Sequence, residues 1–397
     1  MSGWIAKPLA DACERITDGS HRTPPFTEEG YPFATVAHVD DNGIIDLASC
    51  KRISPSDFEE LRRNDCRPLP GDVLFSKDGT VGKVAVIDFD ADFVVLSSLA
   101  ILRPKQDVLN QRFLAYALRS EAVLGDAINR KSGSAIRRIV LRDLRQVCIP
   151  IPPLVEQERI VKLLDEADEL RKLRAQADRR TADLIPALFH EMFGENAKKP
   201  HAHAKLGQIA EVVSGVAKGR KFNGRLPVEV PYLRVANVQA GHLDLSEIKT
   251  IQALPEEVEE LALRKGDVLL TEGGDFDKLG RGAMLEQDLP NYIHQNHVFR
   301  VRVEQSELDP VYFAKFLLTG EARRYFLGCA KRTTNLASIN MTQLRALPVP
   351  LPPLFLQKEF AARVSEIRAM QAEQAASRRR LDDLFHSMLH RVFQGEL

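Results

Sequence analysis

The sequence predicts an α+β fold in which two similar globular domains are separated by two long helices. Three observations support this prediction. A proline-rich hexapeptide, Ile149–Leu154, recurs about 200 residues later at 349–354. A long charged stretch with helical periodicity follows each copy, and short β-branched and aromatic runs with Gly and Asp turns precede each copy. A repeat this long indicates duplication of a whole domain, because solenoids repeat every 20–50 residues or so.

The composition fits a globular protein of a reducing compartment. With 397 residues, each half is long enough to bury a core of its own. The five cysteines are odd in number and form no C-x-x-C pair, so we expect no disulfide framework or zinc site and a cytoplasmic location. We also expect no membrane contact, because no apolar run is long enough to span a bilayer. The 55 basic and 55 acidic residues cancel, which neither requires nor excludes nucleic acid.

The first globular domain is predicted over residues 1–153. Its apolar runs at 73–75, 84–87 and 93–96 indicate strands, and 113–118 indicates a short helix. Pro150, Pro152 and Pro153 then end regular structure and introduce a helix over 154–196. The second half repeats this order, with a globular domain over 197–353 and a helix over 354–397.

A 3-4 spacing in both long stretches predicts a coiled-coil seam with polar residues in its middle. The first seam is expected at Ile160, Leu163, Ala167, Leu170, Arg174, Ala177, Thr181, Leu184 and Leu188. The second is expected at Phe360, Arg363, Ile367, Met370, Gln374, Ser377, Leu381, Leu384 and Met388. Neither seam is apolar enough to form a stable helix alone, so we expect the two long helices to pair with each other. Pro186 should kink or end the first helix, whereas the second carries His386 at that position.

Three small, polar, basic loops in each half are candidate nucleic-acid contacts. Glycines let a backbone approach a ligand closely, and Lys, Arg and hydroxyl side chains contact phosphates or base edges. The candidates in the first half are Ser20, His21, Arg22, Lys77, Thr80, Lys83, Arg130, Lys131 and Ser134. Those in the second half are Lys218, Arg220, Lys221, Asn223, Arg225, Lys278, Arg281, Lys331, Arg332, Thr334 and Asn335. Taken singly, each loop also fits an ordinary solvated turn.

No catalytic constellation is visible in the sequence. The run from Gly79 to Lys83 has too few intervening residues for a P-loop, and Val84 stands where Ser or Thr is needed. The histidines and acids show no metal-ligand spacing, and there is no nucleophile elbow. Thr23-Pro24-Pro25-Phe26 is similar to the Asn/Asp-Pro-Pro-aromatic motif of adenine methyltransferases, but no glycine-rich cofactor loop follows a strand. We therefore predict a binding protein without catalytic residues, metal or cofactor.

The repeated motifs resemble the DNA-specificity subunit of type I restriction-modification systems. The resemblance covers the whole chain. It rests on Gly19-Ser20-His21, on Pro70 to Gly82, on Gly133 to Ile139, and on the duplicated Pro-Pro-Leu-x-x-Gln entry to a helix at 152–157 and 352–357. The ending Phe393 to Leu397 is also typical. The second half departs from the pattern where acidic Glu272-Gly273-Gly274-Asp275 replaces the basic loop.

The resemblance implies two target-recognition domains, each reading one half of a bipartite, asymmetric site in double-stranded DNA. It implies that the helices form an antiparallel coiled coil, relate the halves by a pseudo-twofold axis, and set the spacer between half-sites. Two methyltransferase subunits, which would carry S-adenosylmethionine, and motor-nuclease subunits are the implied partners. Two alternatives remain: a solitary DNA methyltransferase or nuclease with fused recognition domains, and a coiled-coil protein scaffold.

Overall fold

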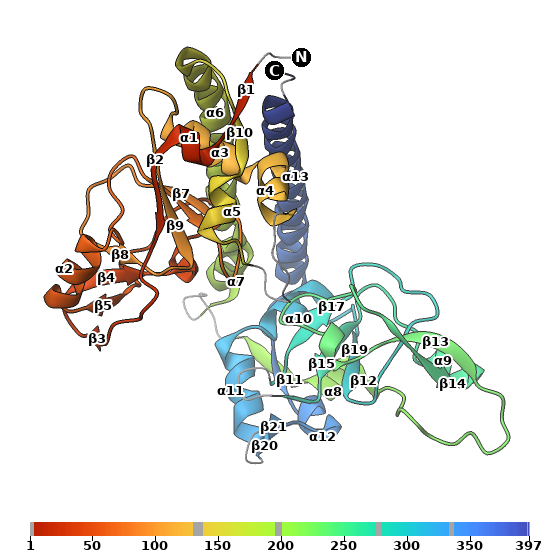
Figure 1. Cartoon of the computed structure of the whole chain (residues 1–397). Coiled ribbons are helices and arrows are strands. Elements are labelled where there is room, and N and C mark those ends of the chain that lie inside the picture. Colours follow the sequence, from red (N-terminus) through yellow and green to blue (C-terminus); the bar gives the residue numbers. More distant parts are fainter. Residues whose placement is uncertain are drawn as a thin grey trace. The chain divides into compact units, whose positions relative to one another are not determined.

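A computed structural model describes residues 4–129, 138–194, 201–274, 279–332, 337–394 and 396 (Figure 1). The chain divides into two compact units. Unit 1 combines Met1–Ala177 with Ala375–Leu397, and unit 2 is Asp178–Gln374. Both units mix strands and helices, as the α+β prediction requires.

Unit 1 is built around an antiparallel inner sheet. The sheet runs in the order β2 (Cys13–Asp18), β9 (Leu99–Pro104), β6 (Val73–Ser76) and β7 (Val84–Val86). Helix α3 (Gln111–Arg119) packs against it through Phe113 and Leu114, which are fully buried. Asn110 caps α3, because its side-chain oxygen accepts from the N–H groups of Arg112 and Phe113.

A second, outer sheet carries its own small core. It runs in the order β3 (Phe26–Thr27), β5 (Lys51–Ile53), β4 (Tyr31–Ala34) and β8 (Val94–Val95), and the β4–β8 pair is parallel. Helix α2 (Pro55–Arg63) begins at Ser54, whose hydroxyl accepts from the Asp57 N–H at 3.1 Å. Phe58 and Leu61 of α2 join Phe33 in a buried cluster.

The rest of unit 1 consists of short connecting elements. They are β1 (Ile5–Pro8) paired with β10 (Cys148–Ile151), α1 (Leu9–Ala12), the 3-10 turn η1 (Val36–His38), α4 (Glu121–Asn129) and α5 (Leu141–Arg145).

Unit 2 repeats this plan. Its inner sheet is β12 (Ala210–Ser214), β19 (Val298–Val303), β15 (Val268–Thr271) and β17 (Gly282–Met284), and its outer sheet is β14 (Lys249–Ala253), β13 (Val228–Leu233) and β18 (Ile293–His294). The connecting elements are β11 (Ala202–Lys205) with β22 (Pro348–Leu351), α8 (Leu206–Ile209), η2 (Val235–Asn237), α9 (Pro255–Glu260), α10 (Pro310–Phe316), α11 (Gly320–Cys329) and α12 (Met341–Arg345). A small sheet of β16 (Gly273–Gly274), β21 (Ala337–Ser338) and β20 (Lys331–Arg332) is added. The duplicated sequence therefore folds into duplicated domains with different loops.

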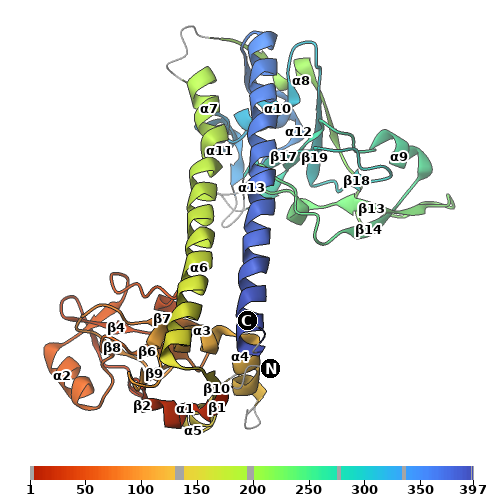
Figure 2. The same ribbon diagram turned by 90° about the horizontal axis from the view of Figure 1, so that it is seen from above.

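Three helices follow the two hexapeptides. They are α6 (Leu154–Ala182), α7 (Leu184–Phe193) and α13 (Leu354–Gln394), and Figure 2 shows α13 as one unbroken helix. The predicted effect of Pro186 is confirmed, because the first helix is interrupted at Asp183. Proline lacks an N–H and clashes with the carbonyl four residues earlier, which is where α6 ends. His386 imposes no such break on α13.

The predicted seam is wrong in part. Leu163 and Leu170 are exposed, whereas Ile160 and Leu164 are buried. The reason is that the apolar face of α6 is covered by the core of unit 1, which also contains Phe393 from the end of α13. Because this core covers α6, Leu164 is buried in place of Leu163, while Ile160 and Ala167 of the predicted seam are also buried.

Each unit uses segments of these long helices to complete its core. In unit 1, the Phe393 ring lies 5.3 Å from that of Phe113, centre to centre. In unit 2, the rings of Phe189 and Tyr312 lie 5.6 Å apart, and Phe360 is fully buried beside them. Within the described ranges, no helix combines the length and the apolar character that crossing a bilayer would need.

Candidate nucleic-acid interface

Three segments of unit 1 that lie far apart in the sequence meet around Lys77. Its backbone N–H donates to the Ser98 carbonyl at 2.9 Å, and its own carbonyl accepts from the Ile139 N–H at 2.8 Å. Its ammonium Nζ lies 3.0 Å from the carboxylate of Asp18 at the end of β2. The loop after β2, the β6–β7 loop and the segment entering α5 are thereby held in one place.

The same contacts remove two predicted residues from the surface. The Lys77 side chain is 2% exposed, so it cannot reach a phosphate in this structure, and its role is to join two loops. Ser20 is buried, and its hydroxyl donates to the Arg22 carbonyl within its own turn. By contrast, Thr80, His21 and Arg22 are exposed. Arg22 lies 3.3 Å from Glu60 and is 62% exposed, which leaves its guanidinium accessible.

Lys83 and Arg281 occupy matching places in the two units and hold matching loops. Lys83 Nζ donates to the Val39 carbonyl at 2.6 Å, and Arg281 Nη1 donates to Gln239 Oε1 at 2.8 Å. Both side chains are half-buried. Their first role is therefore to anchor the chain that follows η1 or η2.

The loop after β12 in unit 2 presents cations to solvent. Lys218 and Lys221 are exposed, and Asn223 is exposed with a positive φ of 49°. The two arginines of this loop are paired instead, Arg220 with Glu257 and Arg225 with Glu256. The hydrogen bond between Arg220 and Glu257 raises the pKa of the guanidinium and lowers the pKa of the carboxyl.

Glu272 takes the place of Lys77 in unit 2. Its N–H donates to the His297 carbonyl at 3.0 Å, and its carbonyl accepts from the Ile339 N–H at 2.8 Å. Its carboxylate lies 2.6 Å from His297 Nδ1, and both side chains are partly exposed. The backbone frame is the same in both units, but a cation in one is an anion in the other.

The structure does not describe the side chains of the remaining predicted DNA-contact residues. Lys331 and Arg332 lie on strand β20, and their side chains are outside the described part of the structure. The following lie outside the described residues: Arg130, Lys131, Ser134, Lys278, Thr334 and Asn335.

The Gly-Asp-Val-Leu motif, which occurs in both halves, has a structural role. Asp72 of the Gly-Asp-Val-Leu motif is buried and binds the Arg103 guanidinium through both oxygens at 2.8 Å. Its counterpart Asp267 binds Arg302 in the same way, at 2.7 and 2.8 Å. Spacing alone gave no sign of Arg103 or Arg302, although each is an arginine on the neighbouring strand.

The glutamine of the Pro-Pro-Leu-x-x-Gln motif ties each long helix to its domain. Gln157 is fully buried, accepts from the Asn110 N–H, and donates to the carbonyls of Val108 and Pro152, all at 2.8 Å. Gln357 makes the equivalent three bonds in unit 2. The sequence shows this glutamine as a repeat but does not show its partners.

Among the residues that the structure describes, no cluster of three or more His, Cys, Asp or Glu side chains is placed to hold a metal ion. The geometry is that of two scaffolds with the same backbone frame, each presenting a different set of polar loop side chains. Such an arrangement can bind a polar partner at two places with two different chemistries.

Comparison with known proteins identifies the family. The family model described as the type I restriction modification DNA specificity domain matches residues 1–178 and again 200–376. The chain is 23% identical to the EcoKI type I restriction enzyme specificity subunit of Escherichia coli and 24% identical to the StySPI specificity subunit of Salmonella potsdam; each match covers 100% of this chain and 89% of the relative.

Solved structures share the fold. A structure from work on complex assembly and conformational transition of the type I R-M system is 19% identical with a TM-score of 0.63, covering 100% of this chain and 99% of that one. The S subunit of a type I restriction-modification system from M. genitalium is 17% identical with a TM-score of 0.54, covering 98% and 96%. The duplicated domains and the two family matches agree: the chain belongs to the type I restriction-modification DNA specificity family and acts in sequence-specific DNA recognition.

Proposed function

We propose that the domains over 1–153 and 197–353 each read one half of a bipartite DNA site. The observation that carries this proposal is that the two units share one backbone frame but expose different loop side chains, for example Arg22 and Thr80 in unit 1 and Lys221 in unit 2. Two copies of one scaffold with different polar loops suit two different half-sites. A single palindromic sequence would instead favour two identical surfaces.

The helices over 154–196 and 354–397 would pair antiparallel, as a coiled coil about a pseudo-twofold axis, and fix the spacer. Contacts inside each unit support this pairing. Arg171 of α6 donates to Asp382 at 2.7 Å in unit 1, and Thr181 donates to Gln374 at 2.8 Å in unit 2. Numbering rises along α6 as it falls along α13, which is the order of an antiparallel pair. A 41-residue helix is about 60 Å long, the scale of one to two turns of DNA.

The DNA contacts that we propose are the exposed members of the predicted set. On the described loops they are His21, Arg22, Thr80, Lys218, Lys221, Asn223 and Arg225. The candidates outside the described residues, together with Lys331 and Arg332, stay predictions from the sequence. Phosphate contacts release counterions, so Lys221→Ala should weaken binding to every sequence and reduce the salt slope by about 1. Lys77→Ala is the matched control: because Lys77 is buried, its loss should lower stability without lowering the salt slope.

The chain would act with partners and carry no catalysis of its own. Two methyltransferase subunits with S-adenosylmethionine, and motor-nuclease subunits, are the partners that we propose for this chain. One of the similar structures comes from work on complex assembly of the type I R-M system, which supports an assembled state.

Methylation mapping tests the proposal. In a host expressing this chain with its neighbouring methyltransferase subunit, we expect modified adenines in a bipartite motif with a fixed gap, only when the chain is present. Exchanging residues 1–153 for those of a relative should change one half-site alone. Methyl transfer by the isolated chain would favour the solitary enzyme, and an intact complex without DNA affinity would favour the protein scaffold.

A further inference from the structure

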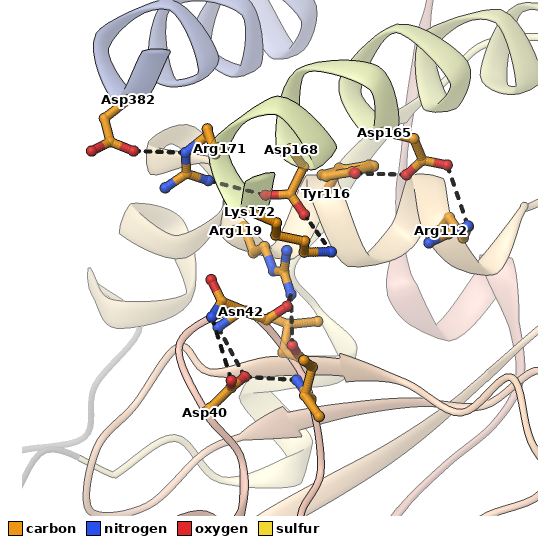
Figure 3. Close-up of polar contacts among 12 residues, drawn as sticks. Asp40, Asn42, Arg112, Tyr116, Arg119, Asp165, Asp168, Arg171, Lys172 and Asp382 are labelled. Carbon is orange, nitrogen blue, oxygen red and sulfur yellow. Dashed lines mark hydrogen bonds and ion pairs between the residues drawn. The ribbon is translucent and has the colours of Figure 1, made fainter. Parts of the chain in front are cut away.

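Arg119, at the end of α3, joins the recognition part of unit 1 to its helical part. Its guanidinium Nη2 donates to the Asn42 carbonyl at 3.2 Å and to the Val84 carbonyl at 2.9 Å (Figure 3). Asn42 belongs to the turn Asp40–Ile44, which leads toward the outer sheet, whereas Val84 begins β7 of the inner sheet. One side chain therefore holds a loop of the outer part against the inner sheet.

The turn that Arg119 holds is itself rigid. The Asp40 carboxylate accepts from the N–H groups of Asn42 and Ile44 at 2.9 and 2.7 Å. Gly43 has a φ of +82°, and a Cβ there would lie 2.1 Å from Arg119 Nη2 and 2.5 Å from the Val84 oxygen. The guanidinium thus fits a close-packed site that tolerates only glycine beside it.

The helix that carries Arg119 is fastened on its other side to the long helices. The hydroxyl of Tyr116, one turn earlier on α3, donates to Asp165 of α6 at 2.7 Å (Figure 3). Asp168, one turn further along α6, pairs with Arg171, which donates to Asp382 of α13. Three sets of polar contacts inside unit 1 therefore join α13 to α6 through Arg171, α6 to α3 through Tyr116, and α3 to the Asp40–Ile44 turn through Arg119. The backbones of α6 and α3 connect one set to the next.

Unit 2 joins the matching turn to its inner sheet through the backbone instead, since the Gly241 N–H donates to the Gly282 carbonyl of β17 at 2.9 Å. Leu318 takes the position of Arg119 and is 44% exposed. The glycine is kept, since Gly241 has a φ of +83° and a Cβ there would lie 3.0 Å from Leu318 Cδ1. The side-chain contact at this position is therefore apolar in unit 2, whereas in unit 1 it consists of two hydrogen bonds from Arg119.

We propose that Arg119 is a positioning residue that holds the outer part of the first recognition domain at a fixed angle to the long helices, so that the first half-site is read at a single spacing. The inference rests on the proposed division of the DNA site into two half-sites. Beside the contact lies a cavity of about 290 Å³, lined by Asn42, Gly43, Tyr116 and Lys172 among others. Without the guanidinium, the turn has open space into which it can shift.

Spacer tolerance is the test, because a loss of stability alone would lower methylation without changing the preferred gap. A plasmid library would carry both half-sites with the native spacer and with spacers one base pair shorter or longer. It would be methylated by the whole complex containing the native chain, Arg119→Leu, or Leu318→Ala as the matched control in unit 2. We expect Arg119→Leu to raise methylation of the altered spacers, relative to the native spacer, about tenfold or more. We expect Leu318→Ala to leave that ratio unchanged.

An unchanged ratio in a folded Arg119→Leu complex would overturn the inference and leave the bipartite proposal intact. Failure of the native chain to show any bipartite motif would overturn the proposed function instead. If Arg119→Leu did not fold, Arg119→Lys would decide by the same ratio, because lysine keeps the charge and the aliphatic stem but loses the planar fork that bonds two carbonyls.

Discussion

Replacing Gln157 by leucine should loosen the first domain from its helix. Leucine has a similar volume but leaves the Asn110 N–H and the carbonyls of Val108 and Pro152 without their partner. A buried polar group left unpaired costs about 1–3 kcal/mol. Taken at the lower end, the three groups together would destabilise unit 1 by about 3 kcal/mol. For a unit of this size, that shifts the melting temperature by roughly 6–12 °C.

Differential scanning calorimetry of the whole chain measures this effect. The equivalent change at Gln357 serves as the matched variant, because its bonds to Asp309, Glu307 and Pro352 measure 2.8, 3.2 and 2.8 Å. Each variant should lower one transition and leave the other in place. If Gln157→Leu moved the unit 1 transition by less than about 2 °C, the three bonds would not hold the helix to the domain.

Three further outcomes are expected. Burial lowers the pKa of His294 to about 4. Below about pH 6.5 the unfolded chain therefore binds a proton at this residue that the folded chain does not bind. The free energy of unfolding of unit 2 should fall by about 3 kcal/mol between pH 6.5 and 4. His294→Val should remove that loss in pH-dependent melting. Asp72→Ala leaves Arg103 unpaired at 28% exposure and should cost about 3 kcal/mol in denaturant unfolding, with no rescue by salt. Thiol labelling of the native protein should modify exposed Cys148 first and Cys13 last, since burial raises the pKa of Cys13 to about 12; rapid labelling of Cys13 would contradict its burial.

Much of the fold could be predicted because duplication makes the sequence its own comparison. The hexapeptide repeat placed both helix starts, and Leu154 and Leu354 are where α6 and α13 begin. The sheet order could not be predicted, because β8 pairs in parallel with β4 across about 60 residues and nothing local specifies that partner. Leu163 and Leu170 were assigned to the buried seam because periodicity shows which residues are apolar but not which surface covers them.

The candidate loops stay predictions as DNA contacts, but the burial of some of their side chains could not be predicted from the sequence. Lys77 reads as a solvated cation in a glycine-rich loop, yet its partner Asp18 lies far away in the sequence and the pair is buried. Exposure depends on such distant partners, and a local pattern does not contain them. The segments around Lys77 meet independently of its side chain, because Ile139 and Ser98 bond its backbone.

The end of the chain has a consequence for how the protein is made. Phe385, Leu389, Val392 and Phe393 belong to the core of unit 1, whose other residues precede 178. On a ribosome adding about 5–20 residues per second, roughly 10–40 s separate the first part of this core from the last. Unit 2 is continuous and has all its residues earlier, so the domain that is synthesised first should finish folding last. In that interval the apolar surface around Phe113 stays uncovered, and a nascent chain stalled near its end would expose it to proteases and chaperones.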